Sequence, residues 1–224
     1  DASRFRTTIC IAKKGEASPT LISWAETFKN HTGYYPMEWR FDNGTEFLHF
    51  QKWAKEKNLT VSPSSAYAHE QNGVAEFSGH YVMQIARTMH IDGGAPKELW
   101  TEACYTTTYV INRLARLGEK EAPILAWRKA MGLRGDETTT NLSFLRVWYS
   151  KAYVHQAKET RVQGMKMDPR AWIGFLVGYE GDNGHCFRIY NPKTKKVTVH
   201  RDVVFWEPKA PKTYDGAADF QIGE

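Results

Sequence analysis

The sequence predicts an α/β unit followed by a small all-β barrel, and two observations lead to this prediction. Residues 1–116 alternate strand-like runs with amphipathic helical runs, which is typical of a sheet covered by helices. Residues from about 144 onward form short β-rich runs separated by turns rich in Gly, Asp and Asn, which favours a barrel. A chain of 224 residues, 42% of them hydrophobic, is long enough for both.

The first part of the chain begins with a strand-like run at 6–12. Ser18 and Pro19 then predict the start of a helix that ends at Gly33. The alternation over 37–41 predicts a short strand, and it leads into the turn sequence Asp42-Asn43-Gly44. A second helix, starting at Thr45, and a strand at 59–61 are expected to follow.

A polar loop over 62–73 is expected to lead into a third helix. Its predicted core stripe comprises Val74, Phe77, Tyr81, Ile85 and Met89, with Glu76 off the stripe in the first turn. A fourth helix, from Lys97 to about Arg116, is apolar over a wide arc and is expected to be buried.

The predicted domains are a core over 1–116, a helical linker over 117–143, a β-barrel over 144–208 and a tail over 209–224. The β-rich runs of the barrel lie at 147–149, 152–154, 173–177, 186–190 and 197–205.

The net charge of +5 decides nothing by itself, but its distribution does. Residues 144–212 carry +7, the preceding parts are nearly neutral, and residues 213–224 carry −3. Three widely spaced cysteines argue against a disulfide framework and favour a reducing, intracellular compartment. No apolar run approaches the roughly 20 residues of a membrane-spanning helix, so no membrane partner is expected.

Two carboxylates occupy places suited to catalysis. Asp42 follows a predicted strand of an open sheet, and Glu76 opens a helix across a polar loop. Carboxylates brought together in this way can bind hard divalent cations, and two ions about 4 Å apart can clamp the attacking and leaving oxygens of a phosphodiester. The alternative is that Asp42 supports its turn and Glu76 only caps its helix.

A longer pattern decides between these interpretations. The run 40–47, Arg-Phe-Asp-Asn-Gly-Thr-Glu-Phe, and the run 71–76, Gln-Asn-Gly-Val-Ala-Glu, resemble the core of the integrase encoded by copia-type retrotransposons. Further matches are residues 1–4, 109–114, 145–154, 178–181, 190–196 and 201–205. They follow in order from residue 1 to about 207.

The resemblance implies an RNase H-like core and an SH3-like module. It implies that Asp42 and Glu76 are catalytic and ligate Mg²⁺ or Mn²⁺ for 3′-end processing and DNA strand transfer. The implied partners are the DNA of the element ends and of the target, with RNA left open, and a homo-oligomer assembled on DNA. Integration implies a nuclear location.

The sequence departs from the family in two places. The family's first catalytic aspartate precedes the segment with which this chain begins, so we expect an N-terminally truncated core that lacks its first strands and that aspartate. We therefore expect no strand transfer from this chain alone. Phe77, Ser78 and Gly79 stand where the family usually has basic residues, which weakens the case for DNA contact there.

The basic second part predicts a nucleic-acid site. The candidate contacts, which lie among aromatic residues, are Lys151, Lys193, Lys195, Lys196 and Arg201. The alternative is a solvated charged face. In the predicted loop beside the active site, His69, Gln71 and Asn72 are candidates to touch substrate, against a merely solvated loop.

These observations lead to a retrotransposon integrase fragment, an enzyme family member that is incomplete by itself. The main alternative is a noncatalytic nucleic-acid-binding relic of a transposable element. An RNase H-like nuclease outside transposition would share the metal chemistry, but it leaves the late motifs unexplained.

Overall fold

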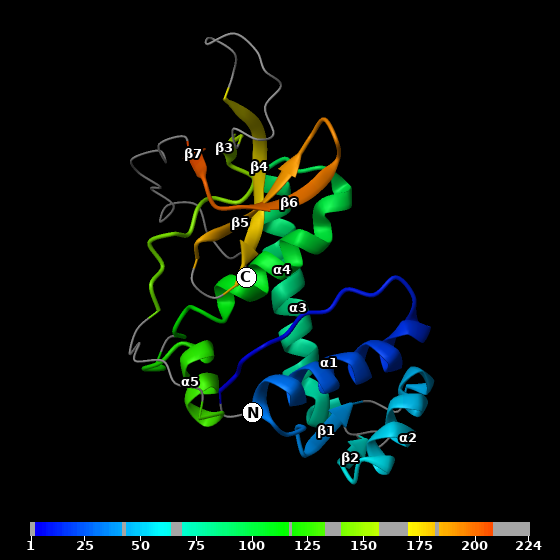
Figure 1. Cartoon of the computed structure of the whole chain (residues 1–224). Helices are drawn as coiled ribbons and strands as arrows, with labels where there is room; N and C mark the ends of the chain where they lie inside the picture. Colours follow the sequence, from blue (N-terminus) through cyan, green and yellow to red (C-terminus); the bar gives the residue numbers. More distant parts are fainter. Residues whose placement is uncertain are drawn as a thin grey trace, which may run out of the picture. The chain divides into compact units, whose positions relative to one another are not determined.

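The computed structural model describes residues 3–41, 44–63, 69–116, 118–132, 140–156, 170–181 and 184–207. The chain divides into two units, one of Asp1–Asp92 with Pro96–Leu142 and one of Gly93–Ala95 with Ser143–Glu224. The first is an α/β unit, and the second is built on a five-stranded antiparallel sheet (Figure 1). The predicted order of an α/β part followed by a β part is confirmed.

The first unit contains two parallel strands, β1 (Glu38–Phe41) and β2 (Thr60–Pro63), paired from Glu38↔Thr60 to Phe41↔Pro63. Helices α1 (Ala17–Thr32) and α2 (Leu48–Glu56) pack against each other beside them (Figure 1). Short 3-10 turns precede the two helices at Lys14–Glu16 and Thr45–Phe47. The helices and strands predicted over 18–61 are therefore present.

Local sequence explains how α1 ends. Gly33 adopts φ 86°, a left-handed conformation that glycine accepts readily, and its N–H donates to the Lys29 carbonyl at 2.7 Å. At the other end, Ser18 does not cap the helix as predicted. Its buried hydroxyl instead accepts the Phe50 N–H at 3.1 Å and donates to the Glu46 carbonyl, which ties α1 to α2.

An aromatic cluster forms the core beneath these elements. Phe50 is fully buried together with Ala54, and Leu59 is buried beside them. The Phe50 ring lies 4.7 Å from Trp39 and 5.4 Å from Trp53, measured between ring centroids. Because these rings come from both β1 and α2, the cluster holds the strand and the helix together.

The segment 6–12, predicted to be a strand, is extended but pairs with no described strand. Its backbone instead bonds to side chains near the end of α4 (Trp100–Ile111). The Asn112 Oδ1 accepts the Arg6 N–H at 2.9 Å, and its Nδ2 donates to the Arg6 carbonyl at 2.7 Å. Farther along, the Cys10 N–H donates to the Tyr105 hydroxyl at 3.3 Å. The strand prediction was wrong because the backbone groups found partners on a helix.

Replacing Asn112 by Ala is expected to lower the free energy of unfolding by about 1–3 kcal/mol. The substitution leaves the Arg6 N–H and carbonyl without their hydrogen-bond partner beside a buried helix end. Urea denaturation measures the loss, and hydrogen exchange over residues 5–10 localises it. Asn112→Asp keeps the acceptor and should lose less. Equal stability of the Ala variant and the wild type would show that the segment is held by other contacts.

Helix α3 (His69–Asp92) packs on α4 and starts earlier than predicted. Its buried residues are Val82 and Ala86, whereas Phe77 is 65% exposed and Tyr81 is 39% exposed. The predicted core stripe was therefore wrong for both aromatic residues. The neighbouring row of side chains on the helix, which includes the buried Val82 and Ala86, is small, so α4 can pack closely against that row. The row that carries Phe77 and Tyr81 then faces solvent.

The segment predicted as a linker, 117–143, belongs to the first unit through Leu142 and contains α5 (Pro123–Ala130). Trp127 stacks on Phe5, with ring centroids 4.8 Å apart, and meets Phe28 of α1 edge-on at 6.4 Å. These contacts pack α5 into the first unit instead of leaving it between two units.

The second unit has the strand order β6-β5-β4-β3-β7, with every pair antiparallel. The strands are β3 (Lys151–His155), β4 (Ala171–Glu180), β5 (Cys186–Asn191), β6 (Lys196–His200) and β7 (Val203–Trp206). Leu176, Val177 and Ile189 form its buried centre. A Cβ at Gly174 would lie 2.5 Å from the Ile189 side chain, so this close packing requires glycine.

One predicted strand of this unit is absent. Residues 147–149 form a turn in which Tyr149 has φ 59°. The Tyr149 N–H donates to the Leu176 carbonyl at 2.9 Å, and its ring stacks on Phe175 with centroids 4.5 Å apart. The apolar run is thus explained by packing of its side chains, not by a strand.

Candidate metal and nucleic-acid sites

The predicted metal ligands, Asp42 and Glu76, are separated in the chain by α2, β2 and the start of α3. Asp42 lies outside the described residues, directly after β1, whose last residue Phe41 pairs with Pro63 at the end of β2. Helix α3 begins at His69, six residues farther along the chain. Parallel strands end at the same edge of a sheet, so β1 and β2 end side by side, and a meeting of Asp42 with Glu76 beyond them stays a prediction.

Glu76 lies on α3, where its side chain is exposed. It has no hydrogen bond or ion pair with any residue that the structure describes, so its carboxylate is available to a ligand. Since the helix starts at His69, Glu76 lies about two turns inside it and not in the first turn as predicted. The helix dipole acts mainly on the first turn and therefore does little to hold this carboxylate.

The three residues predicted in an active-site loop, His69, Gln71 and Asn72, lie instead in the opening turns of α3. Their side chains are outside what the structure describes, so a role in substrate contact stays a prediction. The loop prediction was wrong over 69–73, because the helix that it was expected to precede already begins at His69.

Carboxylate oxygens are the donors that Mg²⁺ and Mn²⁺ prefer, so Glu76 suits a hard divalent cation. Within the described ranges, no group of three His, Cys, Asp or Glu side chains is placed to hold a metal ion. Asp42 lies outside those ranges. A site formed by Asp42 and Glu76 therefore agrees with the donor chemistry and stays a prediction.

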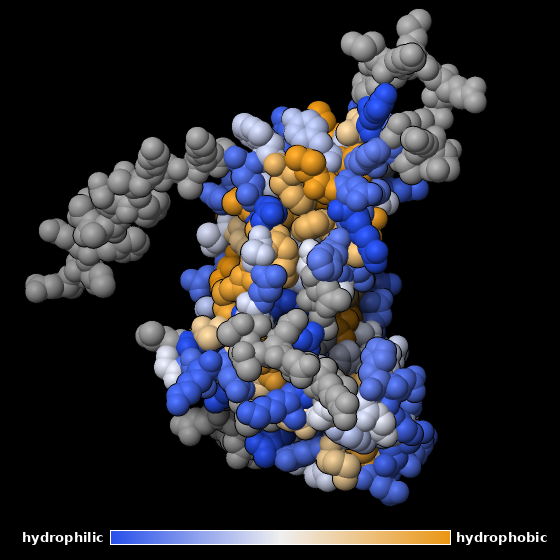
Figure 2. Space-filling model, turned by 60° about the vertical axis from the view of Figure 1, so that its left-hand side comes forward, coloured by the Kyte–Doolittle hydropathy of each residue, from blue (hydrophilic) through white to orange (hydrophobic). Residues whose placement is uncertain are grey.

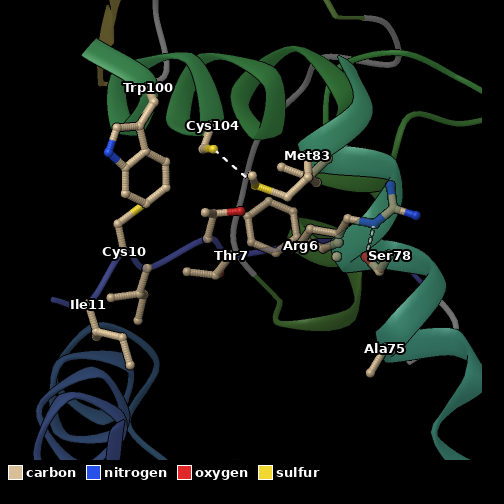
Figure 3. A pocket seen from close by; sticks show the side chains of 14 residues that line it. Arg6, Thr7, Cys10, Ile11, Ala75, Ser78, Met83, Trp100 and Cys104 are labelled. Carbon is tan, nitrogen blue, oxygen red and sulfur yellow. Dashed lines mark hydrogen bonds between the residues drawn. The ribbon is translucent and has the colours of Figure 1, made fainter. Parts of the chain in front are cut away.

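A groove of about 520 Å³ runs between segment 5–11 and helices α3 and α4 (Figure 3). Arg6 points toward Ser78 of α3 and donates to its hydroxyl from Nε, while the Cys104 thiol lies 3.6 Å from the Met83 sulfur. Burial raises the pKa of the Cys104 thiol, which keeps it protonated and supports its role as a core residue. No carboxylate is found among the described residues that line the groove.

A second pocket, of about 330 Å³, is basic, and the sequence did not reveal it. It is lined by Arg4, Arg116 and Lys120, together with Glu119 and Glu121. Glu121 Oε1 lies 3.5 Å from Lys129 Nζ, which partly neutralises that carboxylate. Burial first, and then the positive charge of Arg116, lowers the pKa of the nearby Arg6 guanidinium. Arg4 and Arg116 are far apart in sequence, so no local pattern could have linked them.

The turn between β5 and β6 presents three predicted nucleic-acid contacts, Lys193, Lys195 and Lys196, all of them exposed. Asn191 fixes the turn, because its Oδ1 accepts the Lys193 N–H at 2.9 Å and its carbonyl accepts the Lys195 N–H at 2.8 Å. No ion pair joins these lysines to another residue in the described part of the chain. The turn therefore offers three unpaired cations on a fixed backbone.

Lys151 lies on a different part of the same sheet. It pairs in register with Trp206 of β7, and its Nζ lies 5.6 Å from the centroid of that exposed indole. In Figure 2, hydrophobic residues (orange) reach the surface among hydrophilic ones (blue) at the level of this sheet. The exposed apolar residues on β3, β4 and β7 include Tyr153, Ile173, Val204 and Trp206. Cations beside exposed rings suit contact with nucleic acid.

Arg201 does not lie with the turn that presents Lys193, Lys195 and Lys196, which we name the lysine turn. It follows β6 at the end opposite Lys196, and its Nε donates to the Cys186 sulfur at 3.4 Å. Five residues of strand separate it from the turn, a span of about 17 Å. The five candidate contacts thus form at least two sets in the structure.

Comparisons with known proteins first define the class of the second unit. Residues 150–218 match the family described as the retroviral polymerase SH3-like domain. The five-stranded antiparallel sheet over 151–206 agrees with this match.

The whole chain has a more particular relative. It is 27% identical over 218 residues to the retrovirus-related Pol polyprotein from transposon TNT 1-94 of Nicotiana tabacum, which covers 96% of this chain. The chain spans only 16% of that polyprotein's length. The resemblance read from the sequence is thus confirmed, since the chain is related to retrovirus-related Pol polyproteins in a way that fits the integrase of a retrotransposon.

A solved structure is also similar in outline. It is a simian T-cell lymphotropic virus intasome in complex with PP2A regulatory subunit B56 gamma. The alignment covers 91% of this chain and 68% of the other, at 14% identity and a TM-score of 0.42. Separately, the helices within the described residues include none with the length and apolar character needed to cross a bilayer.

Proposed function

We propose that the chain is the integrase segment of a copia-type retrotransposon polyprotein, with an RNase H-like first unit that acts on DNA ends. The observation that carries the proposal is the exposed Glu76 on α3, whose carboxylate has no partner among the described residues. The relationship to a Pol polyprotein over nearly the whole chain supports it.

In this proposal Asp42 and Glu76 hold Mg²⁺ or Mn²⁺ beside the scissile phosphodiester. When bound, the ions would activate a water or 3′-hydroxyl and stabilise the negative charge on the phosphate oxygens. The chain's own residues then position the reactants, and no covalent enzyme intermediate is needed. The target is chromosomal DNA, so the proposed site of action is the nucleus, with copies of the chain assembled on the element ends.

The experiment that tests this function has two parts. Titration of the 224-residue chain with Mn²⁺ should give heat of binding that depends on both Asp42 and Glu76. Incubation of the longer polyprotein, of which we propose this chain is a segment, with element-end DNA and Mg²⁺ should join a 3′-hydroxyl end to target DNA. A polyprotein that binds DNA yet never joins ends would favour the second candidate, a noncatalytic nucleic-acid-binding protein.

That second candidate is supported by the lysine turn between β5 and β6, which needs no metal to bind phosphates. RNA is a further ligand on the same chemistry. Both candidates require the turn to bind nucleic acid, so variants of the turn test the binding and variants of Glu76 test the catalysis.

Replacing Lys193, Lys195 and Lys196 together by Ala is expected to weaken DNA binding and its salt dependence. Three lost phosphate contacts would lower the slope of log affinity against log salt by about 2.7, so the wild type should lose about 40-fold more affinity than the variant between 50 and 200 mM salt. Fluorescence anisotropy with duplex DNA measures both slopes.

The matched control removes three exposed lysines elsewhere, Lys52, Lys55 and Lys97, with the same change of net charge. If this control lowers the slope as much as the turn variant does, binding depends on net charge and not on the turn.

A further inference from the structure

Helix α3 presents two aromatic side chains to solvent directly after Glu76. Phe77 is 65% exposed and Tyr81 is 39% exposed, and they lie one helical turn apart. Their rings are stacked, with planes 11° apart and centroids separated by 6.0 Å. We name this pair the aromatic platform. An apolar surface of this kind on a solvent-facing helix line is a feature that a binding partner would explain.

A cation borders the platform. The Arg6 guanidinium lies 5.6 Å from the centroid of the Tyr81 ring, and its Nε donates to the Ser78 hydroxyl on the same helix. Its Nη1 is buried and has no hydrogen-bond partner among the described residues. The region therefore combines a flat apolar surface with positive charge, which is complementary to a nucleotide's base and phosphate.

We propose that the aromatic platform stacks an unpaired nucleobase of the DNA end next to Glu76. The proposal rests on the proposed function, since it takes the ligand to be DNA held at this carboxylate. Every base has a π-face that can lie on an exposed ring, whereas a base inside a duplex already stacks on its neighbours. The platform therefore selects a frayed or overhanging nucleotide over a paired one, and so positions the end of the DNA.

The position of Phe77 suits it to hold DNA near Glu76, and the sequence pattern did not show that its side chain is exposed. Phe77 follows Glu76 on the helix, about 100° around its axis and about 1.5 Å along it. A nucleotide whose base stacks on the ring is large enough to keep the backbone of its strand within reach of the carboxylate. Because stacking is tolerant of sequence, the preference is for unpaired structure and not for a particular base.

The experiment measures binding of the 224-residue chain to two DNA probes. One is a duplex with a two-nucleotide overhang that carries 2-aminopurine, and the other is a blunt duplex of equal length. Phe77→Ala is expected to lower affinity for the overhang about 5- to 150-fold, to leave affinity for the blunt duplex unchanged, and to abolish quenching of 2-aminopurine. Phe77→Trp should retain both affinity and quenching, and an abasic overhang should bind the wild type as weakly as the normal overhang binds Phe77→Ala.

Ile91→Ala provides the matched control, because Ile91 is 71% exposed on the same helix about 21 Å from Phe77 along its axis. It should bind both probes as the wild type does. Phe77→Ala should also keep the melting temperature of the wild type, since the ring it removes is mostly in water.

Four results would overturn the proposal. Unchanged overhang binding by Phe77→Ala, with loss on removing the lysine turn, would reject the platform and leave the proposed function standing. Equal losses on both probes would show that Phe77 does not distinguish unpaired bases. Self-association in sedimentation that Phe77→Ala abolishes, with unchanged overhang binding, would assign the platform to a second copy of the chain. Binding of neither probe by the wild type would reject the proposed function and the platform together.

Discussion

In the proposed integrase reaction, replacing Glu76 by Gln is expected to reduce Mg²⁺-dependent joining of DNA ends by the proposed polyprotein by about 10³-fold or more. The amide keeps the size of the side chain but removes the negative charge that a hard cation requires. Since Glu76 is exposed and has no partner in the described structure, the variant should fold and bind DNA as the wild type does. Gel separation of joined and unjoined strands measures the rate.

The matched control for this variant is Glu98→Gln, which makes the same change at another exposed glutamate of the first unit. It should leave joining unchanged. Asp42→Asn should behave as Glu76→Gln does, and the two substitutions together should cost little more than either alone, because each already disables the shared site. Joining by Glu76→Gln at the wild-type rate would remove Glu76 from the catalytic site.

Replacing Phe50 by Ala is expected to lower the free energy of unfolding by about 3–5 kcal/mol. The ring is fully buried and lies between Trp39, Phe41 and Trp53, so its removal loses hydrophobic burial and leaves a cavity bounded by rigid rings. Urea denaturation followed by tryptophan fluorescence measures the change. Because the cluster joins β1 to α2, loss of the ring should also loosen the sheet edge that precedes residue 42.

Leu48→Ala is the control on the same helix, since Leu48 is 60% exposed. It should change the free energy of unfolding by no more than about 0.5 kcal/mol. If Phe50→Ala costs less than about 1 kcal/mol, the aromatic cluster contributes little to the stability of the first unit.

Sequence patterns predicted the elements whose partners lie close along the chain. Helical spacing and a terminal glycine located α1, alternation located β1, and β-rich runs between turns located most strands of the second unit. Segment 6–12 has the composition of a strand, yet its backbone partners are side chains about 100 residues away. Local sequence cannot reveal such partners, so the strand prediction failed there.

The candidate site was predictable in part. The motif placed Glu76 on a helix, and the structure agrees, but periodicity could not decide which of two adjacent helix lines faces α4. Phe77 shows the difficulty, because its hydrophobicity favoured burial while packing by smaller residues left it exposed. The basic pocket at Arg4 and Arg116 was missed because it is assembled from opposite ends of the first unit.

The bonds from Asn112 and Tyr105 to segment 6–10 also set an order of events during synthesis. At about 5–20 residues per second, a ribosome needs roughly 5–20 s to make the chain between Arg6 and Asn112. Throughout that interval the Arg6 backbone lacks the Asn112 side chain that later binds it. Strands β5 and β6, in contrast, are made only a few residues apart. The segment is therefore made well before the helix residues that fix its backbone.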